Sequence, residues 1–266
     1  MPDVYATIAE ADAELQEQLA GVLELRAADP AQRAMLDEYA ARLDLPDGAA
    51  VLEVGCGTGA ISRRLSVLPG VARVTGVDPS AQFIARAREL AEGLPITFAV
   101  GDGRALDLPG EAFDAAVFHT SLCHMPDCEL ALDEAQRVLR PGGRIAVFDG
   151  DYATTTMARN ERDPLQSCAA AVLAMLVHDP WLMRRIAPLL EHHGFKDAEL
   201  RGHSYVSASG TDYFLALVDR GADALAGEGT IGSELAAALK AEGRARMADR
   251  AFFGHIGYVS ALARRP

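Results

Sequence analysis

Residues 51–59 read Val-Leu-Glu-Val-Gly-Cys-Gly-Thr-Gly, an apolar run that carries one acid, Glu53, and leads into three alternate glycines. A chain that turns sharply from a strand into a helix, while a ligand touches its backbone, needs residues without a Cβ atom. Gly55, Gly57 and Gly59 meet that need. The stretch predicts a strand, a tight turn and a helix arranged around a nucleotide-like ligand.

The spacing of these glycines narrows the class of ligand. The pyrophosphate-binding turn of dinucleotide enzymes has the pattern Gly-x-Gly-x-x-Gly, whereas this turn has Gly-x-Gly-x-Gly. A carboxylate at Glu53, two residues before the first glycine, would repel a diphosphate and attract a cation such as a sulfonium or an amino group. A dinucleotide dehydrogenase is therefore the weakest interpretation.

Strand-like and helix-like segments alternate after residue 49. Short and nearly all-apolar runs lie at residues 51–54, 74–77, 96–100, 115–118 and 145–148, with helical patterns at 61–68, 81–91 and 130–139. Runs that are apolar on both faces are typical of parallel strands covered by helices. The expected fold class is α/β, with a doubly wound and mostly parallel sheet.

The two ends of the chain differ from this core. Apolar residues at helical spacing predict two helices within residues 8–43, broken at Asp29-Pro30. After residue 150 we expect a helix at about 182–193, strands at about 198–206 and 255–263, and a helical insertion at about 211–250 before the last strand. We interpret residues 1–266 as a single domain, with a helical lid (1–46), a cofactor-binding core (47–150) and a C-terminal part (151–266).

Charge and composition limit the partners. The chain has 25 Lys and Arg residues against 38 Asp and Glu residues, a net charge of −13. Because nucleic-acid binding depends on neutralising phosphates with basic side chains, we expect no nucleic-acid partner. The longest apolar run, residues 169–177, is far shorter than the roughly 20 residues that span a bilayer, so no membrane insertion is expected. A homo-oligomer is left open.

The four cysteines suggest neither a metal site nor a disulfide framework. Cys56, Cys123, Cys128 and Cys168 lack the paired CxxC spacing of a zinc site. The first residues lack the basic and then apolar segments of a secretory leader. A reduced, cytoplasmic protein without a metal is expected.

Acids follow the second and third apolar runs. Asp78 lies nineteen positions after Gly59, where a doubly wound fold places an acid that accepts both hydroxyls of a ribose. It also suits the cap of a helix that opens at Pro79. Asp102 follows the third run, where a carboxylate can accept from an adenine amino group, and Gly103 admits the ring nearby.

The run from Val51 to Phe148 resembles the methyltransferases of ubiquinone and menaquinone biosynthesis, a group within the class I S-adenosylmethionine-dependent methyltransferases. The motifs that carry the resemblance are the glycine turn, Val-Asp-Pro-Ser at 77–80, Gly-Asp-Gly at 101–103 and Arg-Pro-Gly-Gly at 140–143. The resemblance implies a seven-stranded sheet and S-adenosylmethionine as the cofactor, with S-adenosylhomocysteine as its product.

The resemblance also implies a set of cofactor-binding residues: Tyr5, Glu53, Gly55, Cys56, Gly57, Asp78, Pro79, Asp102, Gly103 and His119. Within this set, Glu53 and the first two glycines would serve the methionine end, Asp78 the ribose and Asp102 the adenine. His119 would lie near the reacting methyl group. Tyr5 is the candidate for an aromatic lid.

The acceptor is expected to be a small organic molecule that is methylated on oxygen, carbon or nitrogen. A sulfonium is already a good leaving group, so the reaction needs mainly a nucleophile placed about 3 Å from the methyl carbon. Where the acceptor must lose a proton, the candidates for a general base are His119, His124 and Asp151. His124 lies in a loop that resembles one in the relatives, although Cys123 replaces the first of their two histidines.

Two further interpretations keep the cofactor but not the methyl transfer. An enzyme of the same fold can retain S-adenosylmethionine while it catalyses a cyclisation or rearrangement, because fold and cofactor motif do not determine the reaction. A noncatalytic protein can bind the cofactor without turnover. Consumption of S-adenosylmethionine in the presence of the true acceptor separates both from a methyltransferase.

Overall fold

The computed structural model describes residues 3–207 and 212–266. Its seven strands form one sheet in the order β3-β2-β1-β4-β5-β7-β6. The strands are β1 (Ala49–Val54), β2 (Val71–Asp78), β3 (Ile96–Val100), β4 (Phe113–His119), β5 (Leu139–Thr156), β6 (Lys196–Ser207) and β7 (Gly254–Arg264). The first five are parallel, whereas β7 runs antiparallel to both β5 and β6. The expected fold class is confirmed.

The parallel strands are connected by helices that bury the sheet. These are α3 (Ala60–Leu65), α4 (Ala81–Leu90) and α5 (Cys128–Val138), with the short η2 (Leu122–His124) before α5. Every residue of β1 is buried. Because β1 lies between β2 and β4, the connections that leave β1 and β4 diverge, and they open a crevice at the carboxyl ends of these strands.

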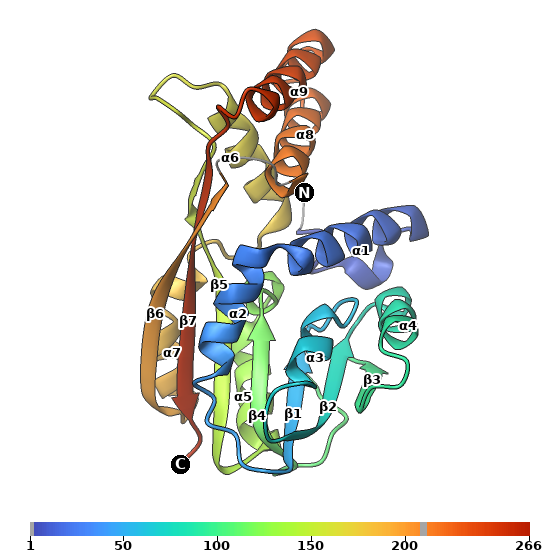
Figure 1. The fold of residues 1–266 in the computed structure, drawn as a ribbon, viewed down its shortest axis with the longest axis vertical. Coiled ribbons are helices and arrows are strands. Elements are labelled where there is room, and N and C mark those ends of the chain that lie inside the picture. The colour runs from blue at the N-terminus through green and yellow to red at the C-terminus, as the bar shows by residue number, and fades with distance from the viewer. Residues whose placement is uncertain (1–2, 208–211) are drawn as a thin grey trace.

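The N-terminal segment lies above that crevice (Figure 1). It comprises η1 (Ile8–Glu10), α1 (Ala13–Ala28) and α2 (Pro30–Ala40). The break between the helices occurs at Asp29, whose side chain accepts hydrogen bonds from the Ala31 and Gln32 backbone N–H groups. A capping acid followed by proline at the first helical position starts a new helix here, as the sequence predicts.

The C-terminal part departs from the sequence prediction in β5. The expected strand ended at residue 148, but β5 continues to Thr156. Asp149 and Asp151 consequently lie within the strand, opposite Val259 and Gly257 of β7. The prediction failed because it followed the apolar run alone, while backbone pairing with β7 carries the strand through polar residues. The expected helix at 182–193 is also split into η3 (Leu182–Arg184) and α7 (Ile186–His192).

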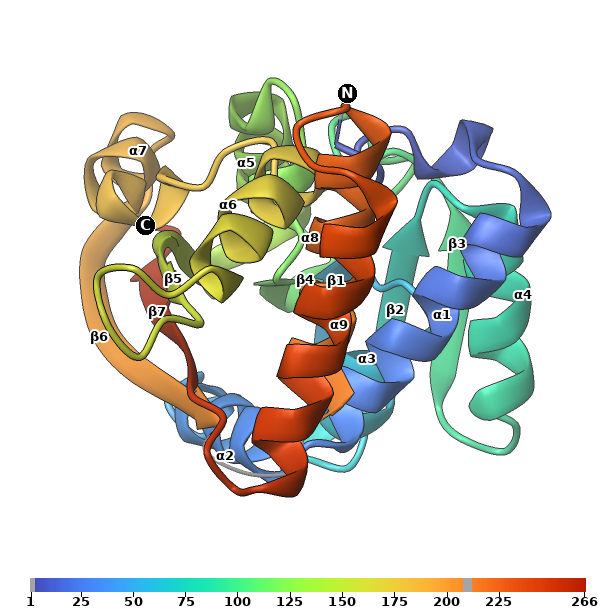
Figure 2. The ribbon, with the colours of Figure 1, turned by 90° about the horizontal axis from the view of Figure 1, so that it is seen from above.

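Three helices cover the extended ends of β5 and β7 (Figures 1 and 2). They are α6 (Leu165–Leu176), α8 (Asp212–Gly227) and α9 (Ser233–Ala248), and the last two lie between β6 and β7 in the chain. Helices α6 and α8 pack closely, because a Cβ atom on Gly221 of α8 would lie only 2.1 Å from the carbonyl oxygen of Cys168 in α6. This helical cap faces α1 through contacts between α1 and α8.

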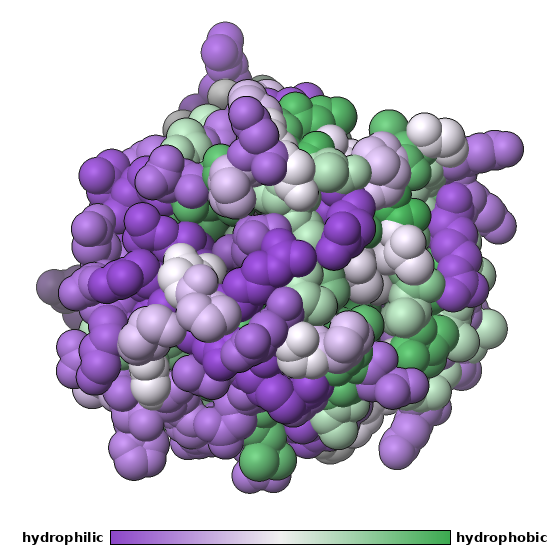
Figure 3. All heavy atoms as spheres, turned by 90° about the horizontal axis from the view of Figure 1, so that it is seen from below, coloured by the Kyte–Doolittle hydropathy of each residue, from purple (hydrophilic) through white to green (hydrophobic). Residues whose placement is uncertain are grey.

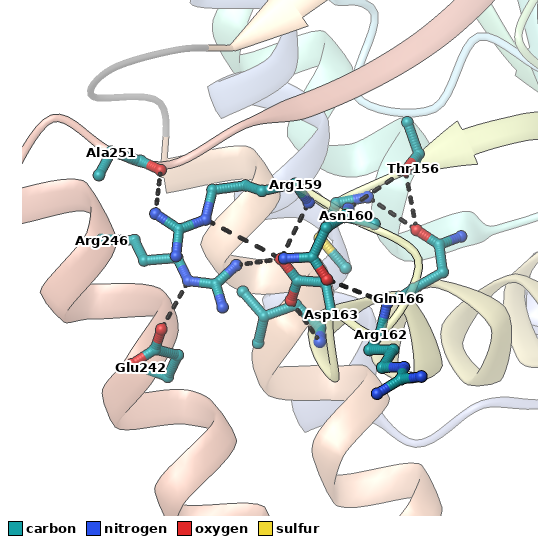
Figure 4. Close-up of polar contacts among 12 residues, drawn as sticks. Thr156, Arg159, Asn160, Arg162, Asp163, Gln166, Glu242, Arg246 and Ala251 are labelled. Carbon is teal, nitrogen blue, oxygen red and sulfur yellow. Dashed lines mark hydrogen bonds and ion pairs between the residues drawn. The ribbon is translucent and has the colours of Figure 1, made fainter.

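A buried ion pair attaches the loop between β5 and α6 to α9 (Figure 4). Arg246 Nη1 lies 2.6 Å from Asp163 Oδ2, and both side chains are buried. The same carboxylate accepts hydrogen bonds from the backbone N–H groups of Arg159 and Leu165. Arg246 Nε also lies 2.6 Å from Glu242 Oε1. Every charge in this cluster therefore has a partner, and the cluster holds the cap together.

The opposite face, at the amino ends of the parallel strands, is mostly hydrophilic, with hydrophobic side chains in small scattered groups (Figure 3). All four cysteines are buried and free. Within residues 3–207 and 212–266, no helix has the length and apolar character needed to cross a membrane. Across the same residues, no group of His, Cys, Asp and Glu side chains is arranged to hold a metal ion.

Candidate active site

A cavity of about 430 Å³ lies at the carboxyl ends of β1, β2 and β4. The crevice where the strand order reverses is the usual ligand site of an open α/β sheet. All ten residues that the sequence suggested for the cofactor line this cavity: Tyr5, Glu53, Gly55, Cys56, Gly57, Asp78, Pro79, Asp102, Gly103 and His119. The structure thus gathers residues from three of the four motifs, together with Tyr5 and His119, around one space.

The glycine turn needs its glycines. Gly55, Gly57 and Gly59 have φ values of +75°, +51° and +73°, a region that side chains with a Cβ atom rarely adopt. A Cβ atom at Gly55 would also lie 2.5 Å from Ser121 Cβ. The backbone itself therefore forms this wall of the cavity.

Asp78 fixes the turn from the neighbouring strand. One carboxylate oxygen accepts from the Gly57 N–H at 2.8 Å, and the other accepts from the Ser80 N–H at 2.9 Å. Each oxygen keeps a further lone pair for a ligand hydroxyl. Burial raises the pKa of Asp78 to about 6. The expected cap at this position is corrected: Ser80, not Asp78, caps the helix, because its hydroxyl accepts from the Phe83 N–H and α4 begins after Pro79.

Glu53 is a buried acid. Its side chain is enclosed between β1 and α3, and it accepts a hydrogen bond from the Ser62 hydroxyl. Burial raises the pKa of Glu53 to about 8, with a further rise from nearby Asp78. The free protein therefore holds this group mainly protonated at neutral pH. A cation in the cavity would favour the carboxylate.

Asp102 and Gly103 form the outer edge of the cavity. Asp102 is paired with Arg104, with Nη2 and Oδ2 2.8 Å apart, and this pairing lowers the pKa of Asp102. Gly103 packs against β1, since a Cβ atom there would lie 2.4 Å from Val54 Cγ1.

His119 is held within an aromatic stack. Its Nδ1 lies 2.9 Å from the Tyr39 hydroxyl, and its ring stacks on Phe148 with 4.7 Å between centroids. Burial and the nearby Arg26 guanidinium keep the pKa of His119 well below its ordinary value. The ring is consequently neutral and a weak proton acceptor, which favours a packing and positioning role over that of a general base.

Unlike His119, His124 contacts a buried carboxylate, that of Asp3. The Nδ1 atom of His124 lies 2.7 Å from Asp3 Oδ2. Asp3 is buried and also accepts from the backbone N–H groups of Tyr5 and His178. If Nδ1 donates to this carboxylate, the lone pair remains on Nε2. The Tyr5 ring lies 4.8 Å from the His124 ring, so the N-terminal segment covers the site.

Arg26 and Thr120 are further cavity residues that the sequence did not suggest. Arg26 lies in the last turn of α1 and donates to the Thr120 hydroxyl. Thr120 directly follows β4 with φ +51°, an unfavourable conformation for a β-branched residue. Strain of this kind is characteristic of functional sites. From sequence, Arg26 looks like a solvated cation at a helix C-terminus, which is why the pattern did not single it out.

A second cavity, of about 50 Å³, adjoins the first. Tyr5, Leu23, Arg26 and His124 line both cavities. The rest of the smaller cavity is lined mainly by side chains of α1, α6, α8, β5 and β7 and is largely apolar.

Asp151 lines neither cavity; its carboxylate lies 2.9 Å from Arg184 Nε. Asp149 is fully buried and accepts from the Cys123 and Gly150 N–H groups. Of the proposed bases, only His119 and His124 therefore reach the site.

The sheet order, the glycine turn and the acids at the ends of β2 and β3 agree with the arrangement that the sequence resemblance implies. Residues 52–147 match the methyltransferase domain family. This chain therefore contains a methyltransferase domain, built from β1 to β5 and their helices.

Curated relatives support the same class. The chain is 34% identical over 151 residues to 27-O-demethylrifamycin SV methyltransferase of Amycolatopsis mediterranei (strain S699), a match that covers 55% of this chain and 48% of the relative. It is 42% identical over 139 residues to 2-methyl-6-phytyl-1,4-hydroquinone methyltransferase of Synechocystis, covering 52% and 41%. In both cases the chain spans less than half of the relative's length.

Solved structures share the fold over most of the chain. A putative methyltransferase of Bacillus halodurans C-125 superposes with a TM-score of 0.60 at 18% identity, covering 87% of this chain and 98% of that one. The [4+2]-cyclase SpnF superposes with a TM-score of 0.54 at 26% identity, covering 88% and 82%. In both cases the structural match extends well beyond residues 52–147.

Proposed function

We propose that this protein transfers a methyl group from S-adenosylmethionine to an oxygen, carbon or nitrogen atom of a small organic molecule. One observation carries the proposal: a single cavity gathers the glycine turn and both acids of a methyltransferase domain. The named activities of the relatives, on a rifamycin and on a hydroquinone, support a small organic acceptor.

The residues present fit S-adenosylmethionine. Asp78 would accept from the ribose hydroxyls, Asp102 would face the adenine, and the backbone of the glycine turn would line the methionine end. Glu53 would take up the cationic amino group as it loses its proton. When bound, the cofactor supplies an electrophilic methyl group on a sulfonium.

His124 would act as the general base where the acceptor must lose a proton. It lies where the two cavities meet, and its Nε2 would take the proton from the acceptor. Asp3 is then a positioning residue, because it holds Nδ1 and so fixes the orientation of the ring. His119, neutral and stacked, would position the reactants.

A second candidate function is a cyclisation or rearrangement on the same fold. The likeness to the cyclase SpnF is the observation that favours it. That reaction would leave the sulfonium intact, so S-adenosylhomocysteine would not accumulate in the presence of the substrate.

Isothermal titration tests the cofactor assignment. We expect S-adenosylmethionine and S-adenosylhomocysteine to bind in a one-to-one ratio, while NADH does not bind. Binding of NADH without S-adenosylmethionine would overturn the proposal. We also propose a cytoplasmic location and no nucleic-acid partner, supported by four free buried thiols and the net charge of −13.

A further inference from the structure

Two guanidinium groups line the small cavity without an ion pair. Arg26, from α1, has one hydrogen bond, to the Thr120 hydroxyl, and Arg220, from α8, has none within the described part of the chain. In a protein of net charge −13, an arginine that faces a cavity without a carboxylate is notable. Both side chains are half-buried, so water only partly replaces the missing partner.

No carboxylate of residues 3–207 and 212–266 lines the small cavity, and the buried Asp3 and Asp149 are already engaged. Asp3 holds His124 and two backbone N–H groups, and Asp149 accepts from two backbone N–H groups. Tyr152 also lines the small cavity and is nearly inaccessible, at 4% exposed, yet its hydroxyl has no hydrogen-bond partner among the described residues. The positive groups and this hydroxyl therefore remain available to a ligand.

The charged groups around the two cavities indicate which charge that ligand must carry. The proposed cofactor carries one carboxylate, which can pair with one guanidinium of the larger cavity, where Arg26 and Arg33 both lack an ion pair. Arg220 lines only the small cavity. One cation is thus left over on the side away from the glycine turn.

We propose that the methyl acceptor has an apolar body and a carboxylate group, and that Arg220 and the Tyr152 hydroxyl bind this carboxylate in the small cavity. The inference rests on the proposed function, because it assigns the small cavity to the acceptor. The planar guanidinium of arginine can donate two parallel hydrogen bonds to a carboxylate, and pairs of this kind are strong where water is excluded. The apolar walls from α6, α8 and β7 suit the body of the molecule. A cationic amine would be repelled by the same two guanidinium groups.

Calorimetry with matched probes tests this assignment. Phenylpropionate, hexanoate and decanoate are each compared with the corresponding primary amide, using protein saturated with S-adenosylhomocysteine. We expect at least one acid to bind about tenfold or more tightly than its amide, because a charge-assisted pair replaces a neutral contact. Arg220→Gln should abolish this preference, whereas Arg220→Lys should retain part of it.

The control is Arg162→Gln, which removes the same charge from an exposed side chain of the loop between β5 and α6 that lines neither cavity. It should leave the preference for the acid unchanged. The proposal is overturned if no acid binds better than its amide, or if Arg220→Gln keeps the preference. Binding of S-adenosylhomocysteine is measured in the same titrations, and its absence would count against the proposed function instead. The acid and amide comparison would then still be made on the free protein.

Discussion

Glu53 is the residue whose protonation state couples the cofactor site to pH between about 6 and 8, the pKa values of Asp78 and of Glu53 itself. A glutamate ionises at about 4.5 when unfolded, whereas the folded Glu53 has a pKa of about 8. The folded state therefore binds more protons between these values. The stability that this group provides is complete below pH 4.5 and is lost as the pH rises through 8.

The affinity for S-adenosylmethionine should consequently rise with pH. Below about pH 8, Glu53 must release a proton before it can hold a cation, so the affinity should increase by up to about tenfold per pH unit. Titration from pH 6 to pH 8 in buffers of different ionisation enthalpy would show proton release on binding. Glu53→Gln should bind more weakly and lose the proton release. A wild-type protein that releases no proton would contradict this account of Glu53.

Asp78 should contribute directly to cofactor affinity. Because a hydrogen bond to a charged acceptor is worth about 1.5–3 kcal/mol, Asp78→Asn should weaken binding by about tenfold to a hundredfold. Asp107→Asn, at an exposed position beyond the third strand, is the matched control. Thermal unfolding of each variant checks the fold, since Asp78 also holds the Gly57 and Ser80 backbone. Equal affinity in both variants would refute the ribose role.

The sequence predicted ten residues that line the larger cavity but not the rest of the site. The glycines and Asp78 follow strands at fixed spacing, so a pattern along the chain reveals them. Asp3, Arg26 and Arg220 belong to no motif, and only the tertiary path brings them to the cavity. Asp151 failed as a candidate for the related reason that its ion pair with Arg184 links residues far apart in sequence.

At the scale of elements, one side chain fastens the first residues of the N-terminal segment to the site. The Asp3 carboxylate joins this segment to His124 and to the His178 backbone, and α1 continues over the crevice. The sequence predicted a helical lid at residues 1–46 but contained no signal for the residue that fastens it. The length of β5 was missed for a comparable reason, because its pairing with β7 lies more than a hundred residues away.

Removal of the Asp3 carboxylate should release the first residues of the chain without unfolding the core of the sheet. In Asp3→Ala, we expect amide hydrogen exchange of the first dozen residues to approach that of an open chain, and S-adenosylhomocysteine to dissociate faster. Asp3→Glu, which keeps the carboxylate, should restore part of the protection. The matched control is Asp47→Ala, at an exposed loop position. Unchanged exchange in Asp3→Ala would show that other contacts hold the segment.

At the scale of the whole molecule, the buried pair of Arg246 and Asp163 stabilises the helical cap that lines the small cavity. Arg246→Met would leave the Asp163 charge buried without its main partner, so the free energy of unfolding should fall by about 3–5 kcal/mol. Arg244→Met, on the same helix, breaks an exposed pair with Asp219 and should cost about 1 kcal/mol or less. Chemical denaturation of both variants measures the difference. Equal losses of unfolding free energy in the two variants would mean that the buried pair contributes no more to stability than the exposed pair.

The central claim, methyl transfer to a small organic acceptor, is tested most directly by following the label from S-adenosylmethionine that carries a trideuterated methyl group. The protein is incubated with this cofactor and a pool of small organic acids, and the products are analysed by mass spectrometry. We expect S-adenosylhomocysteine and an equal amount of a product that carries the trideuteromethyl group, with far less of both from Asp78→Asn. Conversion of an acid to a product without the label, while S-adenosylmethionine stays intact, would contradict the claim and identify the protein as an enzyme that only retains the cofactor.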